Sequence, residues 1–173
     1  NQTGAALRGK LDMLDGVPPD QLWPFASPAL TDPIRGVRLR ATSLLAGTPS
    51  DRLSLAERDK LDRATQEFVA AQTLNADRPE ARAALGNLHV RRGETAEAEA
   101  EFQAALRLSP AYGPAAANLA DLYRQLGRDA DAESVLRKGL AASPRDAGLH
   151  HALGLALVRQ KKQDEAIAEL GRA

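Results

Sequence analysis

The chain has 173 residues, and its 23 lysine and arginine residues balance 23 aspartate and glutamate residues. This neutrality argues against a basic surface for nucleic acid or an anionic membrane. Cysteine is absent, which excludes disulfides, thiolate metal sites, cysteine nucleophiles and covalent haem attachment within this sequence. No apolar run reaches the roughly 18 residues that predict a transmembrane helix. The first residues have neither an initiator methionine nor the basic-then-apolar pattern of a signal peptide, so we expect a processed or excised part of a longer protein.

Helix is the structure that the composition favours throughout the chain. Only 3% of the residues are aromatic, alanine and leucine dominate, and β-branched residues are scarce. Residues 5–15 and 19–30 are predicted to form the first two helices, with a turn at residues 16–19. Pro24 and Pro28 predict that the second helix is short or kinked. Trp23 is interpreted as a core anchor.

The next segment resembles a HEAT repeat. Its Asp32-Pro33, Val37-Arg38, Ala41 and Leu45 follow the DPxxxVRxxAxxxL pattern of that family. The resemblance implies a HEAT-like helical region over residues 1–53, in which Arg38 pairs with Asp32. Arg40, which the pattern does not use, is predicted to be solvated.

A long helix is predicted to follow, over about residues 54–75. Ser54 and Glu57 have the spacing of a capping box at its start. Its Ala64, Phe68 and Ala71 resemble the second helix of a tetratricopeptide repeat, so residues 54–78 are interpreted as a connecting helix.

An internal repeat of constant period organises the rest of the chain. Small and large apolar residues recur in register in the columns Ala64, Ala98, Ala132, Ala166 and Phe68, Phe102, Leu136, Leu170. A second set recurs upstream, in the columns Leu85, Leu119, Leu153 and Gly86, Ala120, Gly154. These spacings are typical of two helices that pack closely. Each unit is therefore predicted to be a helix, a turn and a second helix.

The turns and the ends of the units are marked by glycine and proline. Gly93 and Gly127 separate the two helices of the first two units, where a residue with positive φ can end a helix. Pro110 and Pro144 close these units. In the third unit Lys161 replaces the glycine, which leaves its turn less well defined.

This pattern resembles the tetratricopeptide repeat (TPR) family. Leu85-Gly86, Ala98, Phe102, Ala105 and Pro110 stand at the spacings of its signature. The resemblance implies three units, at 79–112, 113–146 and 147–173, the last of them truncated. Together with the HEAT-like unit they predict an all-α fold, a right-handed α-solenoid of helix-turn-helix repeats.

The resemblance also implies a binding surface, because TPR domains contact ligands through exposed residues of the first helix of each unit. Carried over to this chain, these partner-binding positions are Asn87, Arg91, Asn118, Asp121, Arg124, Gln125, His151 and Arg159. Asn87 and Asn118 occupy slots that hold a peptide carboxylate in some TPR domains. Here Ala83, Pro114 and Ala117 stand where the accompanying lysines would be. The same Asn side chains could instead bond backbone or water at a helix crossing.

No catalytic or metal-binding constellation emerges from the sequence. His89 and His150 fall in aromatic slots of the repeat, so they are interpreted as packing residues with one ring nitrogen satisfied. Glu97, Glu99 and Glu101 alternate along one helix and are interpreted as a solvated face. No nucleophile elbow, phosphate-binding loop or dinucleotide fingerprint is present. An enzyme is therefore not expected, and neither is a cofactor in this chain.

The first functional hypothesis is a non-enzymatic scaffold that binds a peptide or a partner protein in the concave TPR groove. The order of the HEAT-like and TPR segments resembles the C-terminal repeat region of bacterial multihaem cytochrome c-type proteins. This resemblance implies a periplasmic location, with the cytoplasm as the alternative.

The second hypothesis is an oligomerisation or intramolecular packing module without an external ligand. Its basis is the third unit, which has no closing proline or capping helix and is predicted to leave an apolar end face at Leu153, Leu157, Ile167 and Leu170, through which a homodimer could form. A polar groove favours the first hypothesis, and an exposed apolar end face favours the second.

Overall fold

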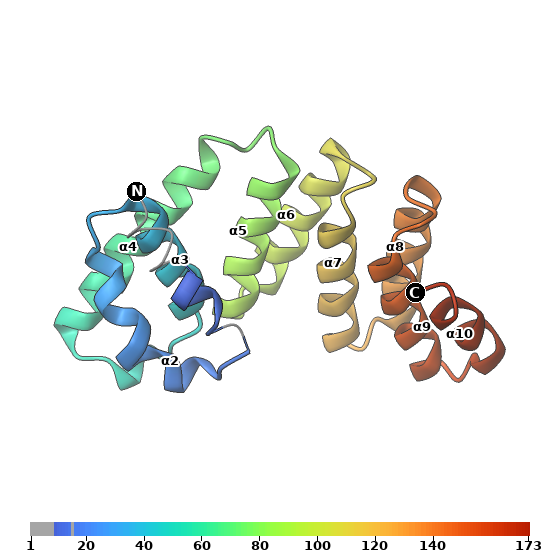
Figure 1. Cartoon of the computed structure of the whole chain (residues 1–173), viewed down its shortest axis with the longest axis horizontal. Helices are drawn as coiled ribbons and strands as arrows, with labels where there is room; N and C mark the ends of the chain where they lie inside the picture. Colours follow the sequence, from blue (N-terminus) through green and yellow to red (C-terminus); the bar gives the residue numbers. More distant parts are fainter. Residues whose placement is uncertain (1–8, 15) are drawn as a thin grey trace. The chain divides into compact units, whose positions relative to one another are not determined.

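The structure, a computed structural model, describes residues 9–14 and 16–173. Its regular elements are helices, and no strand occurs in these ranges. The chain divides into two compact units, Asn1–Leu74 with Arg91–Gly93 and Asn75–Val90 with Glu94–Ala173. Figure 1 shows the helices of each unit in the order of the sequence. The predicted all-α fold is confirmed.

The first unit begins with helical residues at 9–12. Its further elements are α2 (Pro19–Ala26), η1 (Ser27–Thr31), α3 (Arg35–Leu45), η2 (Ser50–Arg52) and α4 (Leu55–Thr73), where η denotes a 3-10 helix. The helix predicted over 19–30 ends at Ala26, because Pro28 has no N–H to continue the α-helical ladder and the chain tightens into η1. The helix predicted over 5–15 lies partly outside the described residues.

The core of the first unit forms where α3 packs against α2, η1 and α4. Its most buried side chains include Leu22, Val37, Leu44 and Leu45. Trp23 packs at the edge of this core, and its indole N–H donates a hydrogen bond to Glu57 Oε1 at 2.9 Å. Trp23 therefore joins α2 to the start of α4.

Two arginine predictions in this unit were wrong. Arg38 pairs with Glu67 on α4 through Nε and Nη2, at 2.7 and 2.5 Å, whereas it reaches only the backbone oxygen of Asp32. The Asp32 carboxylate instead accepts the N–H of Ile34 at 2.8 Å, just before α3 begins. Arg40 is not solvated, because its Nε donates to Asp12 at 2.6 Å. The HEAT-like pattern suggested Asp32, six residues away, as the partner of Arg38. In the folded chain, helix packing brings Glu67 to Arg38 and Asp12 to Arg40 instead.

Helix α4 begins as the sequence predicts. Ser54 Oγ accepts the N–H of Glu57 at 3.4 Å, and Glu57 Oε2 accepts the N–H of Ser54 at 2.9 Å. This capping box satisfies two backbone donors that the first turn leaves without partners. Phe68 and Ala71 are among the buried residues of the helix.

The second unit consists of three helix pairs, apart from residues 91–93, which group with the first unit. They are α5 (Pro79–Arg92) with α6 (Thr95–Leu108), α7 (Gly113–Gln125) with α8 (Asp129–Ala142), and α9 (Ala147–Arg159) with α10 (Gln163–Leu170). Helices α6 and α8 end two residues before Pro110 and Pro144. The helix-turn-helix repeats predicted from the period of the sequence are confirmed.

All three turns between paired helices contain a residue in the left-handed region. Gly93 has φ 75°, Gly127 has φ 72° and Lys161 has φ 61°. The third turn therefore keeps the geometry of the other two although it lacks glycine. A left-handed lysine costs about 1 kcal/mol or more relative to an unstrained residue, which the helix packing on either side offsets.

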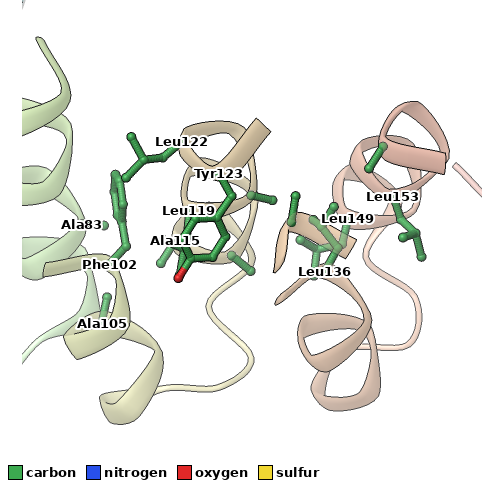
Figure 2. Packing of buried hydrophobic residues seen from close by; sticks show 14 of the residues in the cluster. Ala83, Phe102, Ala105, Ala115, Leu119, Leu122, Tyr123, Leu136, Leu149 and Leu153 are labelled. Carbon is green, nitrogen blue, oxygen red and sulfur yellow. The ribbon is translucent and has the colours of Figure 1, made fainter. Parts of the chain in front are cut away.

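Close helix packing explains the small residues of the repeat. A Cβ atom on Gly86 would lie 2.6 Å from Phe102 Cε1, and one on Gly154 would lie 2.5 Å from Leu170 Cγ. Phe102 itself is completely buried. The buried hydrophobic residues of the second unit form one continuous core. Figure 2 shows part of it, from Ala83 and Phe102 at one end to Leu153 at the other.

The predicted apolar end face was wrong in part. Leu153 and Leu157 are buried, with exposed fractions of 1% and 0%, and belong to the shared core. Leu170 lies against Gly154 and is 37% exposed, so Ile167, at 70%, is the most exposed member of the predicted set. The sequence could not separate these residues, because the side of α9 that α10 covers depends on how the two helices pack.

Candidate functional site

The first helices of the second and third pairs, α7 and α9, contact each other, and side chains of both helices line a groove. Both helices are rich in alanine, and Ala115 and Ala116 of α7 are fully buried. Helix α8 underlies them and contributes Ala132 and Leu136 to the floor.

The groove has a volume of about 410 Å³. It combines small and aliphatic side chains with three charged ones, and its lining consists of Ala117, Ala120, Asp121, Arg124, Ala132, Leu136, Ala152, Leu155, Ala156, Val158 and Arg159. This size and this mixture of apolar surface with few polar groups are typical of binding sites.

The α7 wall is polar and internally bonded. Asp121 accepts hydrogen bonds from Arg124 Nε at 2.9 Å and from Gln125 Nε2 at 2.8 Å, and Arg124 Nη2 also donates to it. The residues are three and four positions apart, so they share one face of the helix. These contacts hold the Arg124 guanidinium in one orientation at the edge of the groove.

The α9 wall is apolar. Leu155 and Val158 are 49% and 53% exposed, although both are aliphatic residues within a helix. Arg159 stands beside them, and its Nε donates to Asp129 Oδ1 at 3.1 Å. The groove thus offers apolar surface on one side and charged groups on the other side and at its end.

The eight partner-binding positions implied by the TPR resemblance do not form one site in the structure. Asp121, Arg124 and Arg159 line the groove together. Gln125 supports Asp121, and Asn118 Nδ2 donates to Asn87 Oδ1 at 2.9 Å, which links α7 to α5. The last two are His151, which is exposed on α9 outside the groove lining, and Arg91, which is exposed and groups with the first unit.

Sequence reasoning missed the apolar half of the groove. Leu155 and Val158 stand one repeat period after Asp121 and Arg124, so the repeat alignment already placed them on the same surface. An aliphatic residue at a position that is polar in the preceding unit was the available signal.

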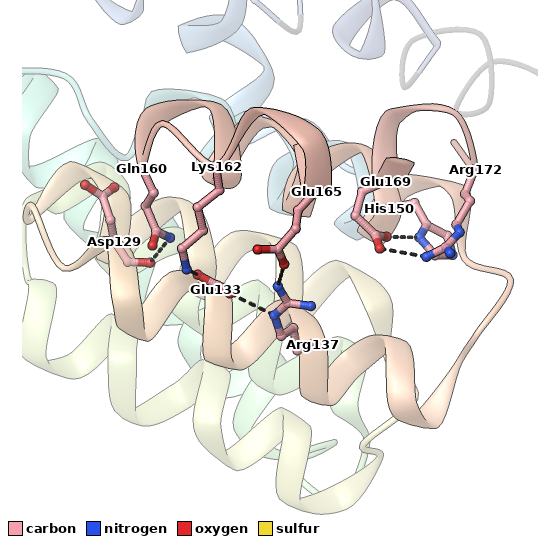
Figure 3. A network of polar contacts seen from close by, with 9 residues as sticks. All are labelled: Asp129, Glu133, Arg137, His150, Gln160, Lys162, Glu165, Glu169 and Arg172. Carbon is pink, nitrogen blue, oxygen red and sulfur yellow. Dashed lines mark hydrogen bonds and ion pairs between the residues drawn. The ribbon is translucent and has the colours of Figure 1, made fainter. Parts of the chain in front are cut away.

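A network of polar contacts, formed by residues that do not line the groove, connects the third helix pair to the second (Figure 3). Glu133 on α8 accepts from Lys162 Nζ at 2.7 Å and from Arg137 Nε at 2.8 Å, and Arg137 Nη2 reaches Glu165 at 2.5 Å. The hydrogen bond from Lys162 is the main reason that the pKa of Glu133 falls to about 2.

His150 and Glu169 form a buried pair between α9 and α10, also drawn in Figure 3. His150 Nδ1 lies 2.6 Å from Glu169 Oε2, and Nε2 lies 3.1 Å from the Pro144 carbonyl oxygen. Both ring nitrogens therefore face acceptors, which favours the doubly protonated ring. The hydrogen bond to Glu169, followed by the one to Pro144, raises the pKa of His150.

The interpretation of the alternating glutamates as a solvated face was wrong for two of the three. Glu99 accepts hydrogen bonds from the Tyr123 hydroxyl at 2.8 Å and from Arg128 Nη1 at 2.9 Å. Glu101 accepts from Arg82 Nη1 at 3.1 Å. Glu97 is exposed. Neighbouring helices supply these partners, which spacing along one helix does not reveal.

Within residues 9–14 and 16–173 no cluster of three histidine or acidic side chains is arranged to hold a metal ion. Among the same residues, no helix combines the length and the apolar character needed to cross a bilayer.

Comparisons with known proteins agree with this geometry. Residues 90–154 match the tetratricopeptide repeat family. A crystal structure of MamA is similar with a TM-score of 0.53 and 22% identity, over 78% of this chain and 75% of that one. A second MamA crystal structure gives a TM-score of 0.54 and 19% identity, over 89% and 88% of the two chains. No curated protein matches the chain.

The repeat match supports a protein–protein interaction scaffold, because stacked repeats create extended concave binding surfaces. The groove between α7 and α9 lies within the matched residues except for its last members, which include Leu155 and Arg159.

Proposed function

We propose that this chain is a non-enzymatic scaffold that binds a peptide or a segment of a partner protein in the groove between α7 and α9. One observation carries the proposal: Leu155 and Val158 are half exposed beside an ordered Asp121–Arg124 pair, in a groove of about 410 Å³. An exposed aliphatic pair next to fixed hydrogen-bonding groups provides both burial energy and orientation for a ligand.

Site-specific photo-crosslinking in cells that produce the protein tests this proposal. A photoreactive residue at position 155 should yield a covalent adduct with a partner. The matched control is position 108, where Leu108 is 48% exposed at the end of α6, outside the groove. Adducts that form at position 108 but not at 155 would contradict the groove assignment.

Self-association is a second candidate function, and the exposure of Ile167 on α10 favours it. The partner would then be another copy of the chain, bound through the third helix pair. Light scattering over a range of concentrations should detect a dimer that Ile167→Glu dissolves and Leu108→Glu does not. A monomer at every concentration would refute this candidate.

The natural context is proposed from sequence resemblance. The HEAT-like segment followed by TPR units supports a place in the repeat region of a bacterial multihaem cytochrome c-type protein in the periplasm. Fractionation of the native organism, with an antibody to this chain, tests the location. Recovery with cytoplasmic markers would exclude the periplasm.

A further inference from the structure

The two walls of the groove differ in chemistry at equivalent repeat positions. Asp121 on α7 corresponds to Leu155 on α9, one repeat period later, and Arg124 corresponds to Val158. The backbone geometry is shared, but one wall presents charges and the other presents aliphatic side chains. A ligand that fills the groove must therefore be apolar on one side and polar on the other.

The hydrogen-bonding groups of the groove favour an anionic polar side of the ligand. Asp121, Arg124 and Arg159 are its charged lining residues, and each arginine is paired with one carboxylate, Arg124 with Asp121 and Arg159 with Asp129. The Asp121 carboxylate is occupied by N–H donors from Arg124 and Gln125. It therefore has little capacity left for a basic ligand.

Arg124 and Arg159 retain donors that no contact among the described residues uses. Arg124 engages Asp121 through Nε and Nη2, and Arg159 engages Asp129 through Nε. A guanidinium carries five N–H donors, so both side chains can bind a further carboxylate. Because the contacts with Asp121 and Asp129 already order these arginines, a ligand loses less conformational entropy when it binds them.

We propose that the groove recognises a short segment in which a leucine, isoleucine or valine stands beside an aspartate or glutamate. The aliphatic side chain lies against Leu155 and Val158, and the carboxylate binds Arg124 and Arg159. The inference deepens the function proposed above and rests on it. The groove volume of about 410 Å³ suits a few side chains of a segment rather than the surface of a folded domain.

Selection from a displayed library of short random peptides, with the whole chain as bait, tests the sequence preference. Peptides that carry an aliphatic residue next to an acidic one should be enriched. The same selection is repeated on the variant Leu155→Ser, which removes the larger of the two aliphatic side chains of the apolar wall without a change in the core, because Leu155 is 49% exposed. The enrichment should then disappear, whereas Leu108→Ser, at 48% exposure, should retain it.

The contributions of the apolar and the charged residues of the groove are separated by measuring the affinity of each variant for a fluorescently labelled copy of the most enriched peptide. Leu155→Ser should weaken binding about tenfold, since it removes most of an apolar contact. Arg159→Gln should weaken it about two- to fivefold, and increasingly less as salt is raised. Arg107→Gln, an exposed arginine on α6, is the matched control and should leave the affinity unchanged. Circular dichroism verifies that each variant is folded.

The outcomes distinguish the two levels of the proposal. Groove-dependent binding of basic or uncharged peptides would overturn the acidic preference but leave the scaffold function standing. Enriched peptides whose binding ignores Leu155→Ser, or a selection without any enriched peptide, would overturn both. Loss of affinity when the acidic residue of the peptide is changed to its amide supports the preference directly.

Discussion

The second and third helix pairs follow the same repeat, yet they fill the slot between their helices differently. The second pair carries Ala116, which is part of the apolar core, and Val135, which packs against that core, whereas the third carries the His150–Glu169 pair. The exposed wall differs as well, since Asp121 in the second pair becomes Leu155 in the third. The comparison teaches that the repeat dictates helix geometry, while the side chain at an individual repeat position is free to be apolar, titratable or exposed.

The largest expected effect on stability concerns the repeat position that Leu136 and Leu170 share. Leu136 and Leu170 occupy the same position in the two pairs, but they are 1% and 37% exposed. Leu136→Ala should lower the free energy of unfolding by about 2–5 kcal/mol, because it leaves a cavity in the core. Leu170→Ala should cost about 1 kcal/mol, because its site already meets solvent. Urea unfolding of both variants checks this, and equal losses would mean that the third pair is packed as tightly as the second.

The next effect concerns the buried His150–Glu169 pair. His150→Gln should cost about 1–3 kcal/mol, since it leaves Glu169 buried without a charged partner on α9. Because the pKa of His150 is raised in the folded state, the stabilisation is fully present below the ordinary histidine value of 6.5 and is lost as pH rises through the raised pKa.

Urea unfolding at a series of pH values measures this dependence. The free energy of unfolding should decline above pH 6.5 in the unaltered chain and should change less in His150→Gln. The neighbouring His151, which is exposed, provides the control, and His151→Gln should keep the original profile. A decline that survives His150→Gln would assign the titration to another group.

The smallest effect concerns the turns. Lys161 has a positive φ of 61° where the second pair has Gly127 at 72°. Lys161→Gly should raise the free energy of unfolding by about 0.5–1 kcal/mol, because glycine adopts this conformation without steric strain but is more flexible when unfolded. The reverse exchange, Gly127→Lys, should destabilise the second pair. Thermal unfolding detects both, and a loss of stability in Lys161→Gly would show that the lysine side chain outweighs the strain.

Part of the candidate site followed from the resemblance to TPR domains. The ligand-contact positions that the resemblance implies include Asp121, Arg124 and Arg159, which the structure brings to one groove. The resemblance did not name Leu155 or Val158, because an aliphatic residue in a helix is ordinarily part of a core. Only the packing of α7, α8 and α9 showed that these two side chains face solvent.

The sequence by itself determined the helix pairs and their turns, because apolar spacing, glycine and proline act over a few residues along the chain. The capping box at Ser54 is of the same kind. The tertiary structure decided the partners of the polar groups, such as Glu67 for Arg38 and Glu99 for Tyr123. It also decided that Leu157 is buried while Val158 is exposed. These outcomes depend on which helices contact each other. A periodic sequence pattern indicates which face of a helix is apolar, but it does not specify which neighbouring helix covers that face.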